Sequence, residues 1–490
     1  MFAPQLPAQQ LLQHATELHR RGQFPAAVEV YRQLLRSFPT NPEILDKLGS
    51  ALTGMGQVEE GRRHLERAIQ LAPTQPIIHH DLAVTYRREG KFAKAEECLD
   101  RALKLAPRHP VYTAAKAELF LIQDDLDRAM KVLEPVRRSA AEHPAVALVF
   151  AAYAPRIGAE REAAEAIGVL LTRADLAPVI RLRLLFAQCY CLDYAGRFDD
   201  AWTAASAGNL AVAATWDADA HSRTIDASIE AWTPEAVRLS PSSSADGSRM
   251  TFVMGLPRCG TSLVARMLSQ IPGVVNAGEP NELILAARDL QGDAASGTPI
   301  FTRPAALTAA RLNERANAYL EQLGKIHPGE AHYVDRMPMN FLNLGLVAKL
   351  FPGAKFIVCG RDRLDLGVAC YTHLFAANYP FMYEAERIGR FIRDAERLQR
   401  HWKAVVPAPI HEVAFEDLVA RPEATARSIV EFVGKPWDER VLEPARKWIA
   451  TVTLPDGSMR DIVPDGRVGI AADYEAHTAP LRAGLGDAPA

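Results

Sequence analysis

The chain has 490 residues, 48% of them hydrophobic and 23% charged, with a formal net charge of -3. This length favours two or three domains, and the balanced charge excludes bulk attraction to nucleic acid or to a membrane surface. No stretch reaches the roughly 18 uninterrupted apolar residues of a membrane span, and the N-terminus lacks the pattern of a signal peptide. We therefore expect a cytoplasmic protein with no nucleic-acid or membrane partner.

The first part of the chain repeats itself. Small residues and prolines recur every 34 residues, and each period holds two segments with apolar residues at helical spacing. The register continues at Asp124, Gly158 and, after a four-residue insertion, Gly196, which makes about six units. The clearest markers are Gly22, Gly56 and Gly90, followed in each unit by Pro39, Pro73 and Pro107.

This pattern resembles tetratricopeptide repeats and covers residues 5–214. The resemblance implies a superhelix of paired helices whose concave face binds a peptide, a protein or a glycan acceptor. The alternative is that the helices only scaffold or dimerise the rest of the chain.

Residues 215–249 leave the repeat register. An amphipathic helix is expected first, and then the sequence SPSSSADGSR, which combines Ser, Pro, Gly and Asp in one run and predicts a flexible connector. We expect the domain boundary there, with a second domain over residues 250–485.

Strands and helices alternate in the second domain. MTFVMG and KFIVCG are short apolar runs typical of buried strands, and each is followed by a helical stretch. Such alternation predicts an α/β domain with a mostly parallel sheet, whose ligands bind at the carboxyl ends of the strands.

The loop GLPRCGTS, residues 255–262, has the spacing of a phosphate-binding loop, but Thr261 stands where such loops have lysine. A nucleotide triphosphatase or kinase also needs a carboxylate for magnesium, and no convincing partner is found. The only cation in the loop is Arg258. A P-loop kinase is therefore the weaker alternative.

Several longer segments carry a more specific resemblance. FVMGLPRCGTSLVARMLSQIPGV, YVDRMPMNFLNLGLVAKLFPGAKFIVCGRDRLDLGVACY, EVAFEDLVARPE and FVGKPWD occur in matching order over residues 250–485. Together they are similar to the sulfotransferase domain of bacterial tetratricopeptide-repeat-containing sulfotransferases, a family related to the tyrosylprotein sulfotransferases. The resemblance implies a P-loop-like fold and metal-free transfer of a sulfuryl group from 3'-phosphoadenosine 5'-phosphosulfate to an acceptor hydroxyl.

The resemblance also implies the residues that hold this donor. The loop is expected to bind the 5'-phosphosulfate, and Arg361 is expected to bind the 3'-phosphate. A second family position for the 3'-phosphate is usually serine, but it is Ala369 in this chain. Arg460 occupies a cofactor-loop arginine position, and Arg467 is a hypothetical replacement for the lost serine hydroxyl. The loop residues expected to contact the donor are Arg258, Cys259, Gly260, Thr261 and Ser262.

Sulfuryl transfer needs a base for the acceptor hydroxyl and a positive charge near the leaving oxygen. By resemblance, Glu279 is the expected base, and Glu282 is its reserve. Arg336 takes the position of a lysine that stabilises the leaving group in relatives, although arginine has a different hydrogen-bond geometry. His373 is an alternative base for which a packing role is favoured.

The departures from the family pattern support a competing interpretation. Cys259 replaces a serine, and Arg336 and Ala369 also differ from the family. A non-catalytic interaction protein with a drifted donor site is therefore the main alternative. The acceptor and the oligomeric state do not follow from the sequence.

Overall fold

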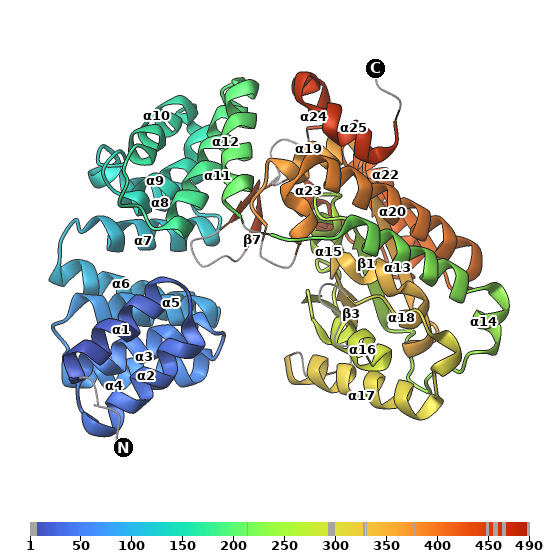
Figure 1. Ribbon diagram of the computed structural model, residues 1–490, viewed down its shortest axis with the longest axis horizontal. Helices are drawn as coiled ribbons and strands as arrows, with labels where there is room; N and C mark the ends of the chain where they lie inside the picture. Colours follow the sequence, from blue (N-terminus) through green and yellow to red (C-terminus); the bar gives the residue numbers. More distant parts are fainter. Residues whose placement is uncertain are drawn as a thin grey trace. The chain divides into compact units, whose positions relative to one another are not determined.

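The computed structural model describes the chain in two compact units, which separate between Arg197 and Phe198 (Figure 1). The described residues are 7–212, 214–292, 299–326, 329, 331–375, 379–446, 450–453, 459–462 and 467–487, with backbone alone at 326, 446, 450–453 and 459–462.

The first unit is built of antiparallel helix pairs, as the repeat pattern predicts. Each pair corresponds to one 34-residue period, and α11 would open the sixth. The helices are α1 (Ala8–Arg20) and α2 (Phe24–Ser37), α3 (Pro42–Gly54) and α4 (Val58–Leu71), α5 (Pro76–Arg88) and α6 (Phe92–Leu105), α7 (Pro110–Ile122) and α8 (Leu126–Arg137), α9 (Pro144–Tyr153) and α10 (Glu160–Leu171), and α11 (Pro178–Tyr194).

The recurring glycines make the turns within the pairs. Gly56 has φ 82° in the left-handed region, which glycine adopts at little cost, and Asp124 adopts φ 59° at the same place in its repeat. The small residue after the turn lets the helices approach closely: a Cβ on Gly61 would lie 2.7 Å from the Gly49 carbonyl oxygen. The repeat markers therefore serve turn and packing geometry.

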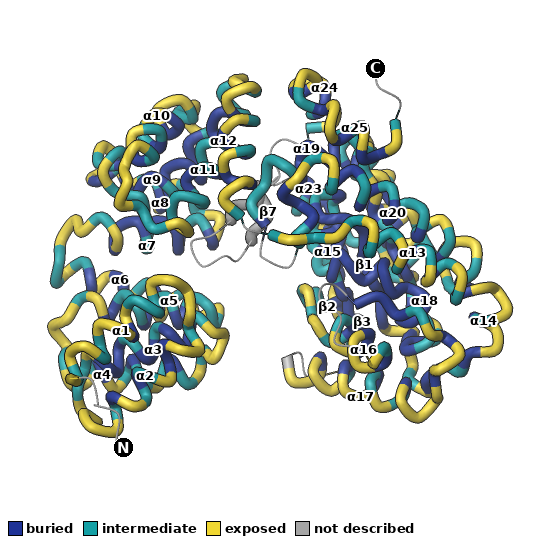
Figure 2. Tube along the Cα trace, viewed as in Figure 1, coloured by how far each residue is buried: buried dark blue, intermediate teal, exposed yellow. Residues whose placement is uncertain are grey.

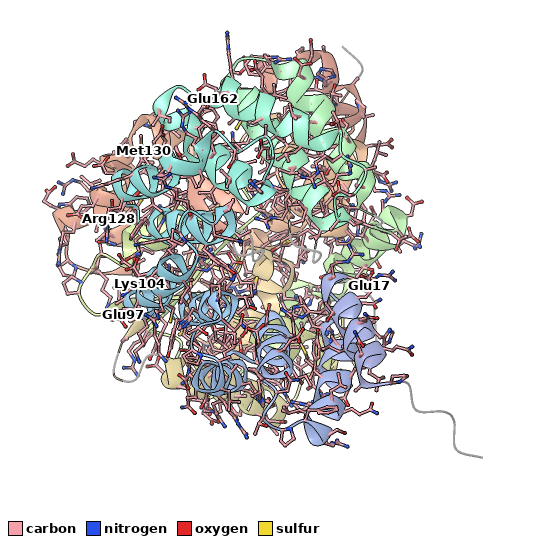
Figure 3. The ribbon with its side chains drawn as sticks, turned by 90° about the vertical axis from the view of Figure 1, so that its left-hand side faces the viewer. Glu17, Glu97, Lys104, Arg128, Met130 and Glu162 are labelled. Carbon is pink, nitrogen blue, oxygen red and sulfur yellow. The ribbon has the colours of Figure 1, made fainter. Side chains whose placement is uncertain are left out.

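The second helices of the repeats carry charged side chains on their exposed sides. Arg137 of α8 donates a hydrogen bond to Glu162 of α10 at 2.6 Å, so neighbouring repeats are joined by a surface ion pair. Figure 3 shows the labelled residues of these helices along one face of the unit: Glu97 and Lys104 of α6, Arg128 and Met130 of α8, and Glu162 of α10.

The second unit contains a five-stranded sheet in the order β2-β3-β1-β4-β5, with every neighbouring pair parallel. This confirms the expected parallel α/β architecture. The strands are β1 (Met250–Gly255), β2 (Val274–Gly278), β3 (His332–Asp335), β4 (Lys355–Gly360) and β5 (Ile410–Ala414), and a separate antiparallel pair is formed by β6 (Ala450–Thr453) and β7 (Met459–Ile462).

Helices surround this sheet, and β1 at its centre is buried along its whole length (Figure 2). The helices of the unit are α12 (Phe198–Ala211), α13 (Ala218–Ala231), α14 (Pro234–Leu239), α15 (Thr261–Leu268), α16 (Glu282–Gln291), α17 (Ala309–Ile326), α18 (Leu344–Leu350), α19 (Arg363–Tyr371), α20 (Ala385–Val405), α21 (Phe415–Ala420), α22 (Pro422–Val433), α23 (Glu443–Arg446), α24 (Ile470–Asp473) and α25 (Ala479–Leu485).

The helix α12, expected to close the sixth repeat, packs within the second unit. Its Trp202 stacks on Tyr371 with ring centroids 4.3 Å apart, and also on His477 at 5.2 Å. Ser206 shares a hydrogen bond of 2.9 Å with the Tyr371 hydroxyl. These contacts connect α12 to the second unit, and the domain bounds 5–214, 215–249 and 250–485 stay a prediction.

The Ser/Pro segment 240–249, expected to be a flexible connector, is held by hydrogen bonds in the second unit. The Ser243 amide donates to the Lys349 carbonyl at 2.9 Å, and the Gly247 amide donates to the Pro352 carbonyl at 2.9 Å. Turn-forming composition predicts an irregular backbone, but it does not reveal that neighbouring carbonyls satisfy that backbone.

Candidate active site

The loop after β1 has a backbone that needs glycine. Gly255 has φ 152° and Gly260 has φ 96°. A Cβ on Gly255 would lie 2.4 Å from the Cys359 carbonyl oxygen, and a Cβ on Gly260 would lie 3.1 Å from Leu418 and Phe415. The loop is thus pressed against the ends of β4 and the following elements, with no room for side chains at either glycine.

The helix α15 starts directly after the loop, with Gly260 as its N-cap. The first amides of a helix have no partner inside the helix, and they carry the positive end of the helix dipole. The Cys259 amide, in contrast, donates to the Leu256 carbonyl at 3.3 Å and is used within the turn. The amides at the start of α15, at Thr261 and Ser262, are therefore the candidates for contact with an anion.

The Cys259 side chain faces the sheet. It is fully buried, and its Sγ lies 2.7 Å from the position of a Cβ on Gly255. The hydrogen bond between the Cys259 and Cys359 thiols, together with burial, raises the pKa of the Cys359 thiol well above its usual value. Cys259 therefore packs beneath the loop, which is a different role from the hydroxyl donor that serine supplies in relatives.

Arg361 follows β4 and reaches back to the loop. Its Nη1 donates to the Arg258 carbonyl at 3.3 Å, its Nη2 donates to the Arg467 carbonyl at 2.8 Å, and its guanidinium lies 4.5 Å from the Phe415 ring centroid. Burial and the charge of Arg258 lower the pKa of Arg361. Its buried Nε has no hydrogen-bond partner among the described residues.

Arg258 and Arg361 therefore bring two positive charges together beside the N-terminus of α15. Arg258 adopts φ 74°, an uncommon conformation for a residue with a side chain, and such conformations concentrate at functional sites. Because a guanidinium has more N–H groups than the two that Arg361 spends on carbonyls, it retains donors for an anion.

The residues expected from the C-terminal part differ in what they contribute. The Arg467 carbonyl contacts Arg361, while its guanidinium pairs with Asp473 and lies 5.4 Å from the Phe198 ring centroid. Arg460 lies in β7, and its side chain is outside the described residues. Arg467 thus meets the site through its backbone, and its proposed replacement of the missing hydroxyl stays a prediction.

The expected base and the expected leaving-group cation are in contact. Arg336 Nη1 donates to the Glu279 carboxylate and also to Ser262 Oγ at 3.1 Å. The backbone supports the same arrangement, because the Arg336 amide donates to the Gly278 carbonyl at 2.9 Å. Arg336 therefore joins Glu279 to the loop.

Asp335 fixes the turn that carries Arg336, and it is not among the site residues predicted from the sequence. The side chain is fully buried and accepts hydrogen bonds from the Tyr319 hydroxyl at 2.6 Å and the Met337 amide at 2.8 Å. Asn340 donates a further bond at 3.1 Å. Burial raises the pKa of Asp335 to about 7. In the sequence, the position of Asp335 directly before Arg336 is the one feature that could indicate this supporting role.

The alternative bases lie in different environments. Glu282 begins α16, and its Oε2 is buried without a hydrogen-bond partner in the described structure. His373 packs edge-on against Phe375 at 5.0 Å, and burial and the charge of Arg258 lower its pKa well below the usual value. Such a histidine is neutral and a weak proton acceptor, which fits the packing role, and His332 is buried and bonded to Thr251 at 2.8 Å.

The strand-loop-helix unit, the converging arginines and the Arg336–Glu279 pair lie at the carboxyl ends of parallel strands in an α/β domain, where they form a candidate site for a phosphate-like anion. Residues 251–439 match the Sulfotransferase family, and residues 12–76 and 52–119 match Tetratricopeptide repeat families. The chain therefore combines tetratricopeptide repeats with a sulfotransferase-family domain.

Individual proteins are similar to part of the chain. An uncharacterized protein of Aquifex aeolicus is 32% identical over 233 residues, covering 46% of this chain and 30% of that protein. Protein-tyrosine sulfotransferase A of Caenorhabditis elegans is 25% identical over 217 residues, covering 41% of this chain and 54% of that protein. The chain thus spans about half the length of that enzyme and less of the Aquifex protein.

For the repeat part, a solved tetratricopeptide-repeat protein of Thermus thermophilus is 20% identical, with a TM-score of 0.33, and the match covers 37% of this chain and 98% of that protein. In the described parts of the chain, no helix combines the length and apolar character needed to cross a membrane.

Proposed function

We propose that the second unit transfers a sulfuryl group from 3'-phosphoadenosine 5'-phosphosulfate to the hydroxyl of an acceptor. The observation that carries the proposal is the convergence of the α15 N-terminus, Arg258, Arg361 and the Arg336–Glu279 pair at one edge of the parallel sheet. The sulfotransferase-family match supports the same reaction class.

The 5'-phosphosulfate is assigned to the loop. The amides of Thr261 and Ser262 at the start of α15 supply directional donors, and Arg258 supplies charge. The close approach at Gly260, where a Cβ would meet Phe415 at 3.1 Å, leaves the backbone itself to face the ligand. This fits a ligand less charged than a triphosphate, for which the missing lysine is no loss.

The 3'-phosphate is assigned to Arg361. Its Nε is buried without a hydrogen-bond partner among the described residues, which is a costly state that a bound anion nearby would relieve. Ala369, at the family's serine position, is buried and offers no hydroxyl. The binding of this phosphate therefore rests on Arg361 more heavily than in the relatives.

In the proposed reaction the acceptor oxygen forms a bond to sulfur while the bond from sulfur to the phosphate oxygen breaks. Glu279 takes the acceptor proton, and Arg336 stabilises the negative charge that develops on the leaving oxygen. The contact between Arg336 and both Glu279 and Ser262 supports these paired roles. The products are the sulfated acceptor and 3'-phosphoadenosine 5'-phosphate.

The repeats are proposed to bind the acceptor or a protein that delivers it. Tetratricopeptide arrays commonly bind peptides on their concave face. Because related sulfotransferases are named for protein tyrosine, a phenolic hydroxyl within a peptide is the first acceptor to test. Peptide, protein and glycan hydroxyls remain the acceptor classes of the proposal.

A non-catalytic interaction protein is the second candidate, and one observation favours it. Arg361 spends Nη1 and Nη2 on the carbonyls of Arg258 and Arg467, and serine is absent at position 369. The two candidate functions differ in whether the sulfuryl group of a bound donor is transferred. Incubation with 35S-labelled 3'-phosphoadenosine 5'-phosphosulfate and a tyrosine-containing peptide library should release 3'-phosphoadenosine 5'-phosphate in step with label on peptide; donor binding without any transfer across peptide and glycan acceptors would favour the non-catalytic protein.

A further inference from the structure

The short segment 467–473 touches the candidate donor site through its backbone. The Arg467 carbonyl accepts a hydrogen bond of 2.8 Å from Arg361 Nη2, and α24 begins three residues later. Gly469, the N-cap of α24, has φ 84°, which turns the chain sharply between the two. The placement of this segment therefore affects where the Arg361 guanidinium lies.

Asp365 holds the same segment from the other side. Its carboxylate accepts hydrogen bonds from the Gly469 amide at 2.5 Å and from the Ala471 amide at 2.9 Å. These amides belong to the start of a helix, where no intrahelical carbonyl is available, so a carboxylate from α19 acts as their cap. Asp365 is buried, with 2% of its surface exposed, which strengthens bonds to its charged form.

Arg361 and Asp365 lie four residues apart in sequence and form hydrogen bonds with the same segment, Arg361 as a donor and Asp365 as an acceptor. Arg361 binds its carbonyl oxygen at Arg467, whereas Asp365 binds its amides at Gly469 and Ala471. The arginine that is proposed to hold the 3'-phosphate and the carboxylate that fixes its backbone partner are thus coupled through residues 467–471.

The far end of the C-terminal part is anchored independently. Leu481 of α25 packs onto Gly367, where a Cβ would approach it to 2.4 Å. Asp487 accepts a hydrogen bond from Arg363 at 3.0 Å. Loss of Asp365 should therefore leave α25 in place and loosen the part of the segment that meets Arg361.

We infer that Asp365 is a positioning residue for the sulfuryl donor, which it serves by holding residues 467–471 against Arg361 so that the guanidinium faces the 3'-phosphate. The inference rests on the proposed function. A positioning role predicts a selective effect on ligands that carry a 3'-phosphate, whereas a purely structural role predicts equal weakening of all nucleotides.

The test is calorimetric titration of the full chain with 3'-phosphoadenosine 5'-phosphate and, separately, with adenosine 5'-monophosphate, which lacks the 3'-phosphate. In Asp365→Asn, the Kd for the bisphosphate should rise about tenfold, because one amide of the segment loses its acceptor, while the Kd for the monophosphate stays unchanged. In turnover, the donor KM should rise with kcat retained. Asp487→Asn, which removes an anchor at the far end, is the matched control and should change neither Kd.

Equal Kd changes for both nucleotides, or none for either, would overturn the role of Asp365. Failure of the unsubstituted chain to bind the bisphosphate would instead overturn the proposed function, so the two failures are distinguishable. If Asp365→Asn does not fold, Asp365→Ser, which retains a shorter hydrogen-bond acceptor, is titrated with the same two nucleotides. Thermal melting checks that this variant is folded.

Discussion

The Arg336 guanidinium donates a hydrogen bond to the Glu279 carboxylate and bridges it to Ser262 of the loop. The side chain of Glu279 is 41% exposed, whereas that of Arg336 is 24% exposed, so the carboxylate stands on the accessible side of the pair. In the proposed reaction, Glu279 can therefore contact the acceptor hydroxyl while Arg336 stays beside the sulfuryl group. This contact leads to separate expectations for the base and for the cation.

Glu279→Gln should lower kcat by about 100-fold or more, because the amide cannot accept the acceptor proton. The donor Kd should stay within a few-fold, since Glu279 lies on the acceptor side. Steady-state kinetics at saturating acceptor measure kcat, and equilibrium titration with the donor measures Kd. Glu282→Gln is the matched control at the start of α16; if it abolishes turnover while Glu279→Gln does not, the base is Glu282.

Arg336 is expected to act through its charge more than through its fork of donors. Arg336→Met removes that charge and should lower kcat by about 100-fold, the scale of losing one group that stabilises developing charge. Arg336→Lys keeps the charge, restores the residue of the relatives, and should retain more than a tenth of the activity. Equal losses in the two variants would show that charge is not what Arg336 contributes.

Asp335→Asn should destabilise the fold and lower activity together. The buried carboxylate accepts bonds from Tyr319, Met337 and Asn340, so an amide would place a donor against at least one donor. We expect a loss of about 1 to 3 kcal/mol in the free energy of unfolding, and a lower kcat because the turn carries Arg336. Urea unfolding followed by tryptophan fluorescence checks the first value; unchanged stability would contradict the assigned role.

His332 should make a destabilising contribution to the second unit as the pH falls from about 6.5 to 4, in a range where the raised pKa of Asp335 contributes with the opposite sign. Burial lowers the pKa of His332 to about 4, and the ring is bonded to Thr251. Because the unfolded chain binds a proton near pH 6.5 and the folded chain does not, the stabilisation is complete above pH 6.5 and is lost as the pH falls toward 4. The loss from this group should reach about 3 kcal/mol.

Unfolding free energies at several pH values measure that slope. His332→Gln removes this ionisation, so the free energy of unfolding of the variant should fall less steeply with acid than that of the unsubstituted chain. The exposed His14→Gln should leave the curve unchanged, and the same slope in all three proteins would rule out His332 as its source.

Much of this architecture follows from local pattern. The 34-residue register predicts the helix pairs, because a turn glycine such as Gly56 and a close-contact residue such as Gly61 each need a small side chain. The parallel sheet follows from alternating elements, and the loop at residues 255–262 is visible from its spacing. These features are determined by residues near one another in sequence.

The remaining features depend on residues distant in sequence. Trp202 joins α12 to Tyr371 and His477, and nothing in the repeat register indicates those partners. The Asp365 carboxylate accepts hydrogen bonds from the amides of Gly469 and Ala471, which are more than a hundred residues away in sequence. Such contacts arise from tertiary packing, so the packing of α12 and the supporting carboxylates could not be predicted from composition or periodicity.

The most direct test of the proposed function is calorimetric titration of the full chain with 3'-phosphoadenosine 5'-phosphate, compared with the Arg361→Met variant. The proposed function predicts saturable binding to the unsubstituted chain and a Kd at least about tenfold higher in the variant, because a charge-assisted contact to the 3'-phosphate is lost. Absence of binding to the unsubstituted chain at millimolar ligand would contradict it.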